Sequence, residues 1–241
     1  MKFSLNTLVL YLSTLTLSGC VSIGMKSLDA VDLKKMKSVA VISLIDSPIA
    51  YPYIGTTVFQ NKEQALDISK WNIKDFIEQS MVKKLRASGY FARVGILSKS
   101  IPASNLLGKD GAAIMISAAK AEGYDSVLAI EPMADGTNFP IQTGIRLGVA
   151  SQFGIKRSNL SLLASVRIYN TGTQELFAWR RAFDNIGGNP AATSPDSVPW
   201  KASAMELTAS DLEQIQKVLK AQIERELNYA MEVLGLVKES K

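Results

Sequence analysis

The alternation of apolar, β-branched runs with segments of helical periodicity constrains this fold more than any other sequence feature. Strand-like runs and helical segments follow one another at residues 38–44, 70–88, 90–97, 111–122 and 125–131. Each helical segment is followed by a glycine, Gly89 or Gly123, the residue that most often ends a helix. Strands that alternate with helices in this way predict an α/β sheet with right-handed crossovers.

A different pattern begins after this region. Three strand candidates with little helix between them occupy residues 143–153, 159–169 and 173–183. The last two flank Asn170-Thr171-Gly172, a tight-turn sequence. They therefore predict an antiparallel hairpin that extends the sheet.

The C-terminal part combines a loop and a helix. Residues 187–207 contain two adjacent glycines and three prolines, which predicts a long surface loop, with Trp200 fixing it to the body. From Ser210, the expected N-cap, apolar residues recur at helical spacing up to Leu234. The expected fold is α/β: a mixed sheet with a βαβαβ start, an antiparallel hairpin, and a long C-terminal amphipathic helix packed on the sheet. Residues 38–241 are expected to form one domain.

The N-terminus has the charged, apolar and small-residue order of a secretory signal. Lys2 precedes a leucine-rich stretch over residues 5–17, which is shorter than the roughly 20 residues that cross a bilayer. Leu17-Ser18-Gly19-Cys20 resembles the lipobox of bacterial lipoproteins. The resemblance implies that residues 1–19 are removed, that Cys20 carries a diacylglyceryl group, and that residues 20–37 form a lipidated tether. The alternative is an ordinary cleaved signal followed by a buried cysteine.

The residue after the lipidated cysteine carries sorting information in lipoproteins. Aspartate at that position favours retention in the inner membrane, and this chain has Val21. The resemblance therefore implies an outer-membrane protein, lipid-anchored on the periplasmic side, whose membrane contact is the lipid on Cys20. No further cofactor is expected.

Composition narrows the function classes. The chain has 27 basic and 22 acidic residues, a mild excess rather than the clustered basic stripe expected for nucleic-acid binding. It contains no histidine and a single cysteine. The commonest general base and metal ligand are therefore missing, and a Ser-His-Asp triad is impossible. We expect a non-enzymatic protein that does not bind nucleic acid or a metal ion.

Three carboxylates form the best catalytic hypothesis. Asp46 follows the first strand, Glu131 ends the third, and Asp135 comes shortly after it. Ligands of open α/β sheets bind beyond the carboxyl ends of the strands, so these acids could share one edge as a cation or acid–base site. The alternative is that they form turns and helix caps.

An aromatic-rich stretch follows the first strand. Tyr51, Tyr53 and Phe59 lie within residues 49–59, and tyrosine and phenylalanine are enriched in binding interfaces. They are the candidate interface residues. The alternative is that they cover the edge of the core.

The mature sequence resembles a group of envelope proteins that includes CsgG, LpoB and the TolB amino-terminal domain. Two segments carry the resemblance, Leu85-Arg-Ala-Ser-Gly-Tyr-Phe91 and Ala118-Ala-Lys-Ala-Glu-Gly-Tyr-Asp-Ser-Val-Leu128. Members of this group work by binding, so the resemblance implies an accessory module for an envelope assembly or secretion system, with an envelope protein as partner.

Two other functions are compatible with the sequence. The first is a subunit of an oligomeric, CsgG-like secretion pore, in which residues 143–183 enter the membrane and the chain forms a homo-oligomer. The second is a carboxylate-dependent hydrolase that uses Asp46 and Glu131.

Overall fold

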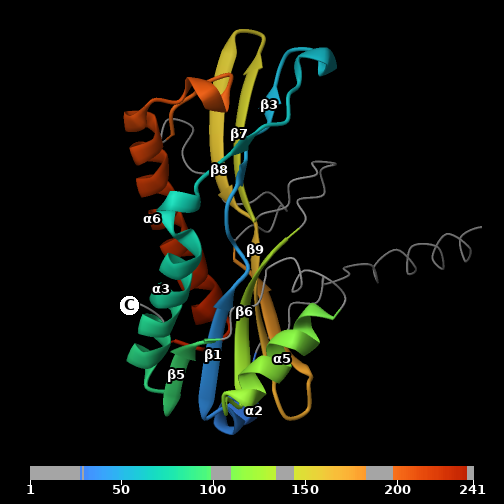
Figure 1. Ribbon diagram of the computed structural model, residues 1–241, viewed down its shortest axis with the longest axis vertical. Coiled ribbons are helices and arrows are strands. Elements are labelled where there is room, and N and C mark those ends of the chain that lie inside the picture. The colour runs from blue at the N-terminus through green and yellow to red at the C-terminus, as the bar shows by residue number, and fades with distance from the viewer. Residues whose placement is uncertain (1–27, 29, 99–109, 134–143, 183–197, 238–241) are drawn as a thin grey trace, which may run out of the picture.

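The computed structural model describes residue 28 and residues 30–98, 110–133, 144–182 and 198–237. The predicted signal sequence, Cys20 and Asp135 lie outside these residues. The molecule is elongated, with two sheets arranged one after the other along its length and helices packed against them (Figure 1). Among the described residues, none of the helices is both long enough and apolar enough to cross a bilayer.

Sheet A is the mixed sheet that the sequence predicts. Its strands run in the order β10-β9-β6-β1-β5. They are β1 (Ser38–Ser43), β5 (Arg93–Ile96), β6 (Ser126–Pro132), β9 (Ala164–Asn170) and β10 (Leu176–Arg181). β1 pairs in parallel with β5 and β6, whereas β9 pairs antiparallel with β6 and β10. The βαβαβ start and the following hairpin are confirmed.

Helices cover both faces of sheet A, which explains why every residue of β1 is buried. α3 (Ile73–Ser88) and α6 (Ala209–Val233) lie on one face, and α5 (Gly111–Ala121) lies on the other (Figure 1). Successive β1 side chains point to opposite faces, so Val39 belongs to the core below α3 and α6, and Ala40 to the core below α5. Gly89 ends α3 with a φ of 71°, as its position predicts.

Sheet B contains a hairpin that the sequence analysis missed. Its strands are β2 (Ile49–Ala50), β3 (Tyr53–Ile54), β4 (Ala65–Leu66), β7 (Ile145–Gln152) and β8 (Ile155–Leu162). β7 pairs antiparallel with β8 and, on its other side, in parallel with β2 and β3. Only Leu163 separates β8 from β9, so the chain passes directly from sheet B into sheet A. The prediction of a single strand over 159–169 is therefore wrong.

α6 is the expected amphipathic helix and contacts both sheets, through β8 and β9, as well as α3. Its apolar stripe is buried, including Ile215, Leu219, Ile223 and Leu227. The N-cap is Thr208 rather than Ser210, because Thr208 and Asp211 form the capping box. The Thr208 side chain accepts from the Asp211 amide, and Asp211 accepts from the Thr208 amide.

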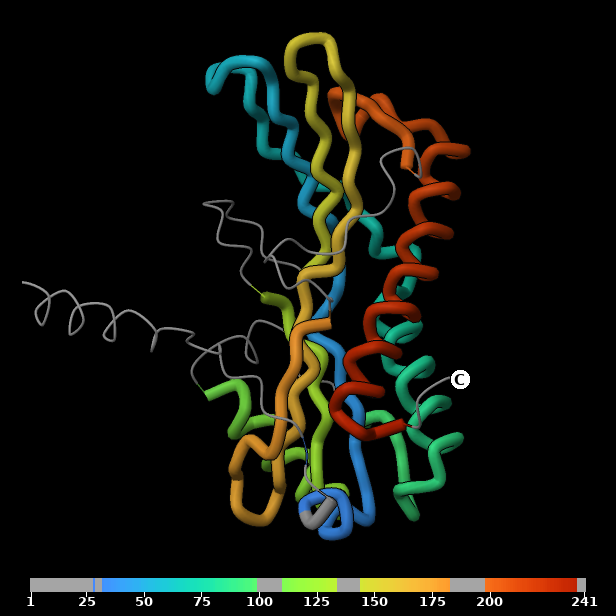
Figure 2. The backbone as a smooth tube through the Cα atoms, turned by 180° about the vertical axis from the view of Figure 1, so that it is seen from behind, coloured from blue at the N-terminus to red at the C-terminus, as the bar shows by residue number. Residues whose placement is uncertain are grey.

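The folded body begins before the predicted boundary at Ser38. α2 (Ala30–Lys35) precedes β1, and Met36 is buried in the core. Leu33 packs against the same core, with its Cδ1 atom beside Gly235. The part of the predicted 20–37 tether that can act as a spacer is therefore shorter than expected. Figure 2 shows α2 at one end of the molecule and the β7–β8 turn at the other.

Candidate functional site

The two described carboxylates of the catalytic hypothesis lie at one edge of sheet A but in different environments. β1 and β6 are parallel neighbours, with Ser43 paired to Ile130. Asp46 follows β1, and Glu131 is the next-to-last residue of β6, so both lie near the carboxyl ends of these strands. Asp46 is exposed, and its Oδ1 atom accepts a 2.8 Å hydrogen bond from the amide of the next residue, Ser47.

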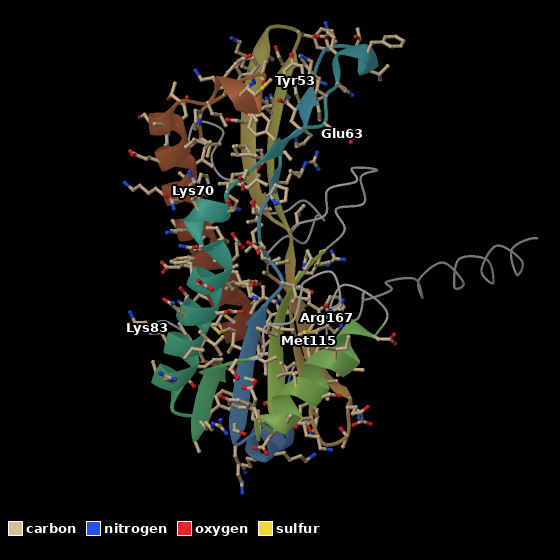
Figure 3. The ribbon with its side chains drawn as sticks, viewed as in Figure 1. Tyr53, Glu63, Lys70, Lys83, Met115 and Arg167 are labelled. Carbon is tan, nitrogen blue, oxygen red and sulfur yellow. The ribbon has the colours of Figure 1, made fainter. Side chains whose placement is uncertain are left out.

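Glu131 is held by side chains of β9. Arg167 Nη1 lies 3.1 Å from Glu131 Oε2, and the Tyr169 hydroxyl donates a 3.1 Å hydrogen bond to Glu131 Oε1. Burial raises the pKa of Glu131, and the Arg167 guanidinium opposes that rise. This cluster links β6 to β9 across the sheet, in the middle of the molecule where Figure 3 labels Arg167. The described residues contain no cluster of three or more His, Cys, Asp or Glu side chains that could hold a metal ion. Since Asp135 is not described, the three-carboxylate hypothesis stays a prediction.

The three candidate interface aromatics occupy very different environments. Tyr51 is fully buried, and its hydroxyl donates a 2.9 Å hydrogen bond to the Lys201 carbonyl oxygen. Burial, together with the charges of Glu206 and Asp211, raises the pKa of Tyr51 to about 12. Assignment of Tyr51 to an exposed interface is therefore wrong. Its ring belongs to the core under the 198–207 segment, which covers it.

Tyr53 is half-buried and supports that same segment. Its ring meets the Trp200 ring edge-on, with 6.5 Å between centroids. Trp200 Nε1 donates a 2.8 Å hydrogen bond to the Ala150 carbonyl oxygen of β7, and Lys156 Nζ lies 4.4 Å from the Trp200 ring centroid. The prediction that Trp200 fixes the loop to the body is confirmed for the described part of that loop, residues 198–207.

Phe59 is the exposed member of the three. It lies in the 3₁₀ helix η1 (Val58–Gln60), which projects from the end of sheet B (Figure 1). The five most exposed large apolar side chains of the described residues are Phe59 (96%), Met205 (93%), Phe153 (86%), Val58 (75%) and Ile155 (56%). All five lie at the sheet B end, on η1, the β7–β8 turn, the first residue of β8 and the 3₁₀ helix η3 (Ala204–Glu206). We call these five residues the distal tip.

Hydrogen bonds hold the segments of the distal tip together. β3 and β7 run parallel, so both chains leave sheet B in the same direction. At that end Thr56 Oγ1 donates to the Ser151 carbonyl oxygen at 3.4 Å, and Gln152 Nε2 donates to the Gly55 carbonyl oxygen at 3.5 Å.

Gln64 links the segment that carries Met205 to the segment that carries Phe59. Its side chain donates to the Ala202 carbonyl oxygen at 3.2 Å and accepts from the Ser203 hydroxyl at 3.0 Å. The distal tip is therefore a set of exposed apolar side chains on a fixed base.

Basic residues border the distal tip. Lys62, Lys156 and Arg157 are exposed beside it. Over residues 55–63, 151–157 and 201–206, which carry the tip, there are four basic and two acidic residues. Figure 3 places Tyr53 and Glu63 at this end, far from Arg167. The tip is thus apolar at its surface and mildly positive around it.

Comparisons with known proteins do not assign a family. No family model and no curated protein matches the sequence. Among solved structures, the chain is similar to a Xanthomonas campestris protein of the family DUF330, at 14% identity and a TM-score of 0.37, over 82% of this chain and 84% of that one. It is also similar to the PelC dodecamer from Paraburkholderia phytofirmans, at 14% identity and a TM-score of 0.29, over 85% of this chain and 94% of that one. Likeness at this level carries no functional assignment, so the site is judged on its own geometry.

Sequence reasoning found Phe59 but missed the rest of the distal tip. Phe153 occupies a turn position with a φ of 50°, where Asn, Asp or Gly is usual, so Gly154 alone marked the turn. Met205 lies in a stretch read only as a loop. Phenylalanine and methionine are usually core residues, and exposure of either cannot be read from composition.

Proposed function

We propose that this protein is a lipoprotein anchored by Cys20 to the periplasmic side of the outer membrane. In this proposal its α/β domain is a non-enzymatic binding module for an envelope assembly, and it contacts another envelope component through the distal tip. The sequence Leu17-Ser18-Gly19-Cys20 supports the anchor, and Val21 supports the choice of membrane.

The distal tip is the observation that carries the binding role. Exposed apolar side chains are common when scattered, but a concentration of the most exposed ones on one end of a molecule marks an interaction site. Burial of one phenylalanine side chain contributes about 1.5–3 kcal/mol, so contact through Phe59 and Phe153 alone is a substantial driving force. Tyr53, Trp200 and Gln64 hold the segments in place, which limits the entropy lost on binding.

The position of the tip fits a tethered module. α2, which connects to the lipidated region, lies at the end of the molecule opposite the β7–β8 turn (Figure 2). The anchor therefore restrains one end and leaves the other end available to a second component of the envelope.

In-cell photo-crosslinking tests the binding role. A photoreactive aromatic amino acid replaces Phe59 or Phe153, with Lys217 on the exposed face of α6 as the matched control position. We expect adducts, with protein or with lipid, at both tip positions and not at Lys217. Equal labelling at all three positions, or none, would contradict the proposed role.

The anchor is tested separately. The Cys20→Ser variant should lose incorporation of radiolabelled palmitate. Continued labelling of this variant would show that the lipobox assignment is wrong.

A further inference from the structure

We infer that the component contacted by the distal tip is a lipid bilayer with anionic headgroups, and that the tip gives the protein a second point of membrane attachment. This inference rests on the proposed function and specifies the partner of the same surface. Phe59, Phe153, Val58, Ile155 and Met205 would enter the interfacial region of the bilayer, with Lys62, Lys156 and Arg157 at headgroup level.

The shape of the tip favours a bilayer over a protein surface. Phe59 and Phe153 are almost fully exposed and stand on two separate projections, η1 and the β7–β8 turn. A protein partner would need two pockets that match both projections. A bilayer interface accepts any convex apolar surface, with a gain that scales with the apolar area buried.

The charges around the tip also favour a bilayer with anionic headgroups. Lys62, Lys156 and Arg157 are all exposed, and the three tip segments carry four basic against two acidic residues. Each basic residue near an anionic membrane surface strengthens binding about fivefold. Below the apolar side chains, Trp200 and Tyr53 form an aromatic pair with Lys156 over the Trp200 ring, the type of residue that is enriched at membrane–water interfaces.

The dimensions of the molecule make a second attachment geometrically possible. β8 and β9 cover residues 155–170, sixteen residues that run from the tip toward the α2 end, or roughly 50 Å at about 3.3 Å per residue. Eight residue steps separate Cys20 from Leu28, which reach at most about 29 Å. A molecule lying along the membrane can therefore contact it with both the lipid and the tip. Two linked contacts bind more tightly than either alone.

The test uses vesicle co-flotation of residues 20–241 with Cys20 replaced by serine, a chain that carries neither the lipid nor the leucine-rich stretch over residues 5–17. Vesicles contain phosphatidylethanolamine and phosphatidylglycerol at about 7:3, or phosphatidylcholine alone. We expect flotation with the anionic vesicles, and a loss of at least about tenfold in the partition coefficient for Phe59→Ser/Phe153→Ser, given the transfer free energy of two phenylalanines. Lys156→Gln/Arg157→Gln should weaken binding to the anionic vesicles only, by roughly thirtyfold at low salt and by less at high salt.

Matched controls separate insertion from unfolding. Ile114→Ser removes a partly exposed apolar side chain from α5, far from the tip, and should leave flotation unchanged. All variants should keep the circular dichroism spectrum and urea midpoint of the parent chain, because the substituted side chains are exposed.

Several results would overturn the inference, and each of them points to a different alternative. No flotation of the parent chain, or flotation that survives the double phenylalanine substitution, rejects bilayer docking through the tip. If in-cell adducts then contain protein only, the proposed binding role stands with a protein partner. If the parent chain self-associates without vesicles and Phe59→Ser/Phe153→Ser abolishes this, the tip joins two copies of the chain instead. If the tip forms no adducts at all, the proposed function fails as well.

Discussion

At the scale of single residues, two glycines with positive φ differ in the space around them. Gly144 has a φ of 82° and lies directly before β7, where an added Cβ would collide with Ile45 Cδ1 and lie 3.3 Å from the Leu163 carbonyl oxygen. Gly89 has a φ of 71° at the end of α3, with no atom within 4 Å of an added Cβ. Both need the left-handed conformation, but only Gly144 also needs the absence of a side chain.

Gly144→Ala should therefore be the more damaging of the two substitutions. Left-handed strain costs about 1–2 kcal/mol, and overpacking adds roughly 1–3 kcal/mol. We expect Gly144→Ala to lower the free energy of unfolding by about 2–5 kcal/mol and Gly89→Ala by about 1–2 kcal/mol, measured by urea denaturation at 25 °C. Equal losses would show that the contact with Ile45 relaxes.

The raised pKa of Tyr51 makes the stability of the fold depend on pH. Its pKa is raised to about 12, from 10.0 in the unfolded chain, so the folded state disfavours the ionised ring. The contribution of Tyr51 to stability is fully present below about pH 10 and is lost as the pH rises toward about 12. At pH 7 we expect Tyr51→Phe to cost about 1 kcal/mol, through loss of the hydrogen bond to Lys201.

The difference in stability between the parent chain and Tyr51→Phe should shrink as the pH rises above 10. Urea denaturation at pH 7, 9 and 11 measures it. A constant difference across this range would mean that Tyr51 ionises equally easily in the folded and unfolded chains.

At the scale of secondary-structure elements, Asp125 joins the starts of two central strands. Its Oδ2 atom accepts hydrogen bonds from the Lys37 amide at 3.2 Å, the Ser38 amide at 3.0 Å and the Ser38 hydroxyl at 3.0 Å. The Thr171 amide donates to the Asp125 carbonyl oxygen at 2.9 Å. One residue thus connects the start of β1, the start of β6 and the turn between β9 and β10.

Asp125→Ala should destabilise the fold by about 2–3 kcal/mol, because three donors lose a charged acceptor at once. Asp110→Ala is the matched control: Asp110 is exposed and its side chain does not cap α5. That variant should stay within about 0.5 kcal/mol of the parent chain. The midpoint of thermal unfolding, followed by circular dichroism, gives both values. Comparable losses in the two variants would contradict the linking role of Asp125.

The elements that were predicted correctly are those whose local pattern agrees with their tertiary environment. β1 is a β-branched run between two covered faces, and Gly89 ends α3 where its sequence position suggests. The β7–β8 hairpin was missed because Phe153 occupies its turn and because Lys156 and Arg157 make the start of β8 polar. The site was predicted less well than the fold. Tyr51 and Phe59 belong to one aromatic stretch, and only the packing of residues 198–207 over Tyr51 decides which ring is buried.

At the scale of the whole molecule, α6 and the β8–β9 connection make the two sheets one body. α6 contacts β8 in sheet B and β9 in sheet A, and one core contains buried residues from both sheets. Loss of packing under α6 should therefore weaken both sheets together rather than release one of them.

Leu219→Ala tests this cooperativity. Leu219 is fully buried in the α6 stripe, and a leucine-to-alanine cavity costs about 2–5 kcal/mol. We expect native-state hydrogen exchange to show the same loss of protection in β1 and in β7. The Lys217→Ala variant, which replaces an exposed residue of the same helix, should show no loss of protection in either strand. A loss confined to one sheet would indicate that the sheets unfold independently.

The path of the chain from α2 through β1, β2 and β3 to Phe59 has a mechanical consequence. If the lipid holds one end and the tip holds the other, tension between these points would pass along this stretch of backbone. β1 would then slide against β5 and β6, and the ladder hydrogen bonds on both of its edges would have to break nearly together. Such shear loading spreads force over many bonds at once. A molecule built this way would resist extension along its length better than peeling from its side.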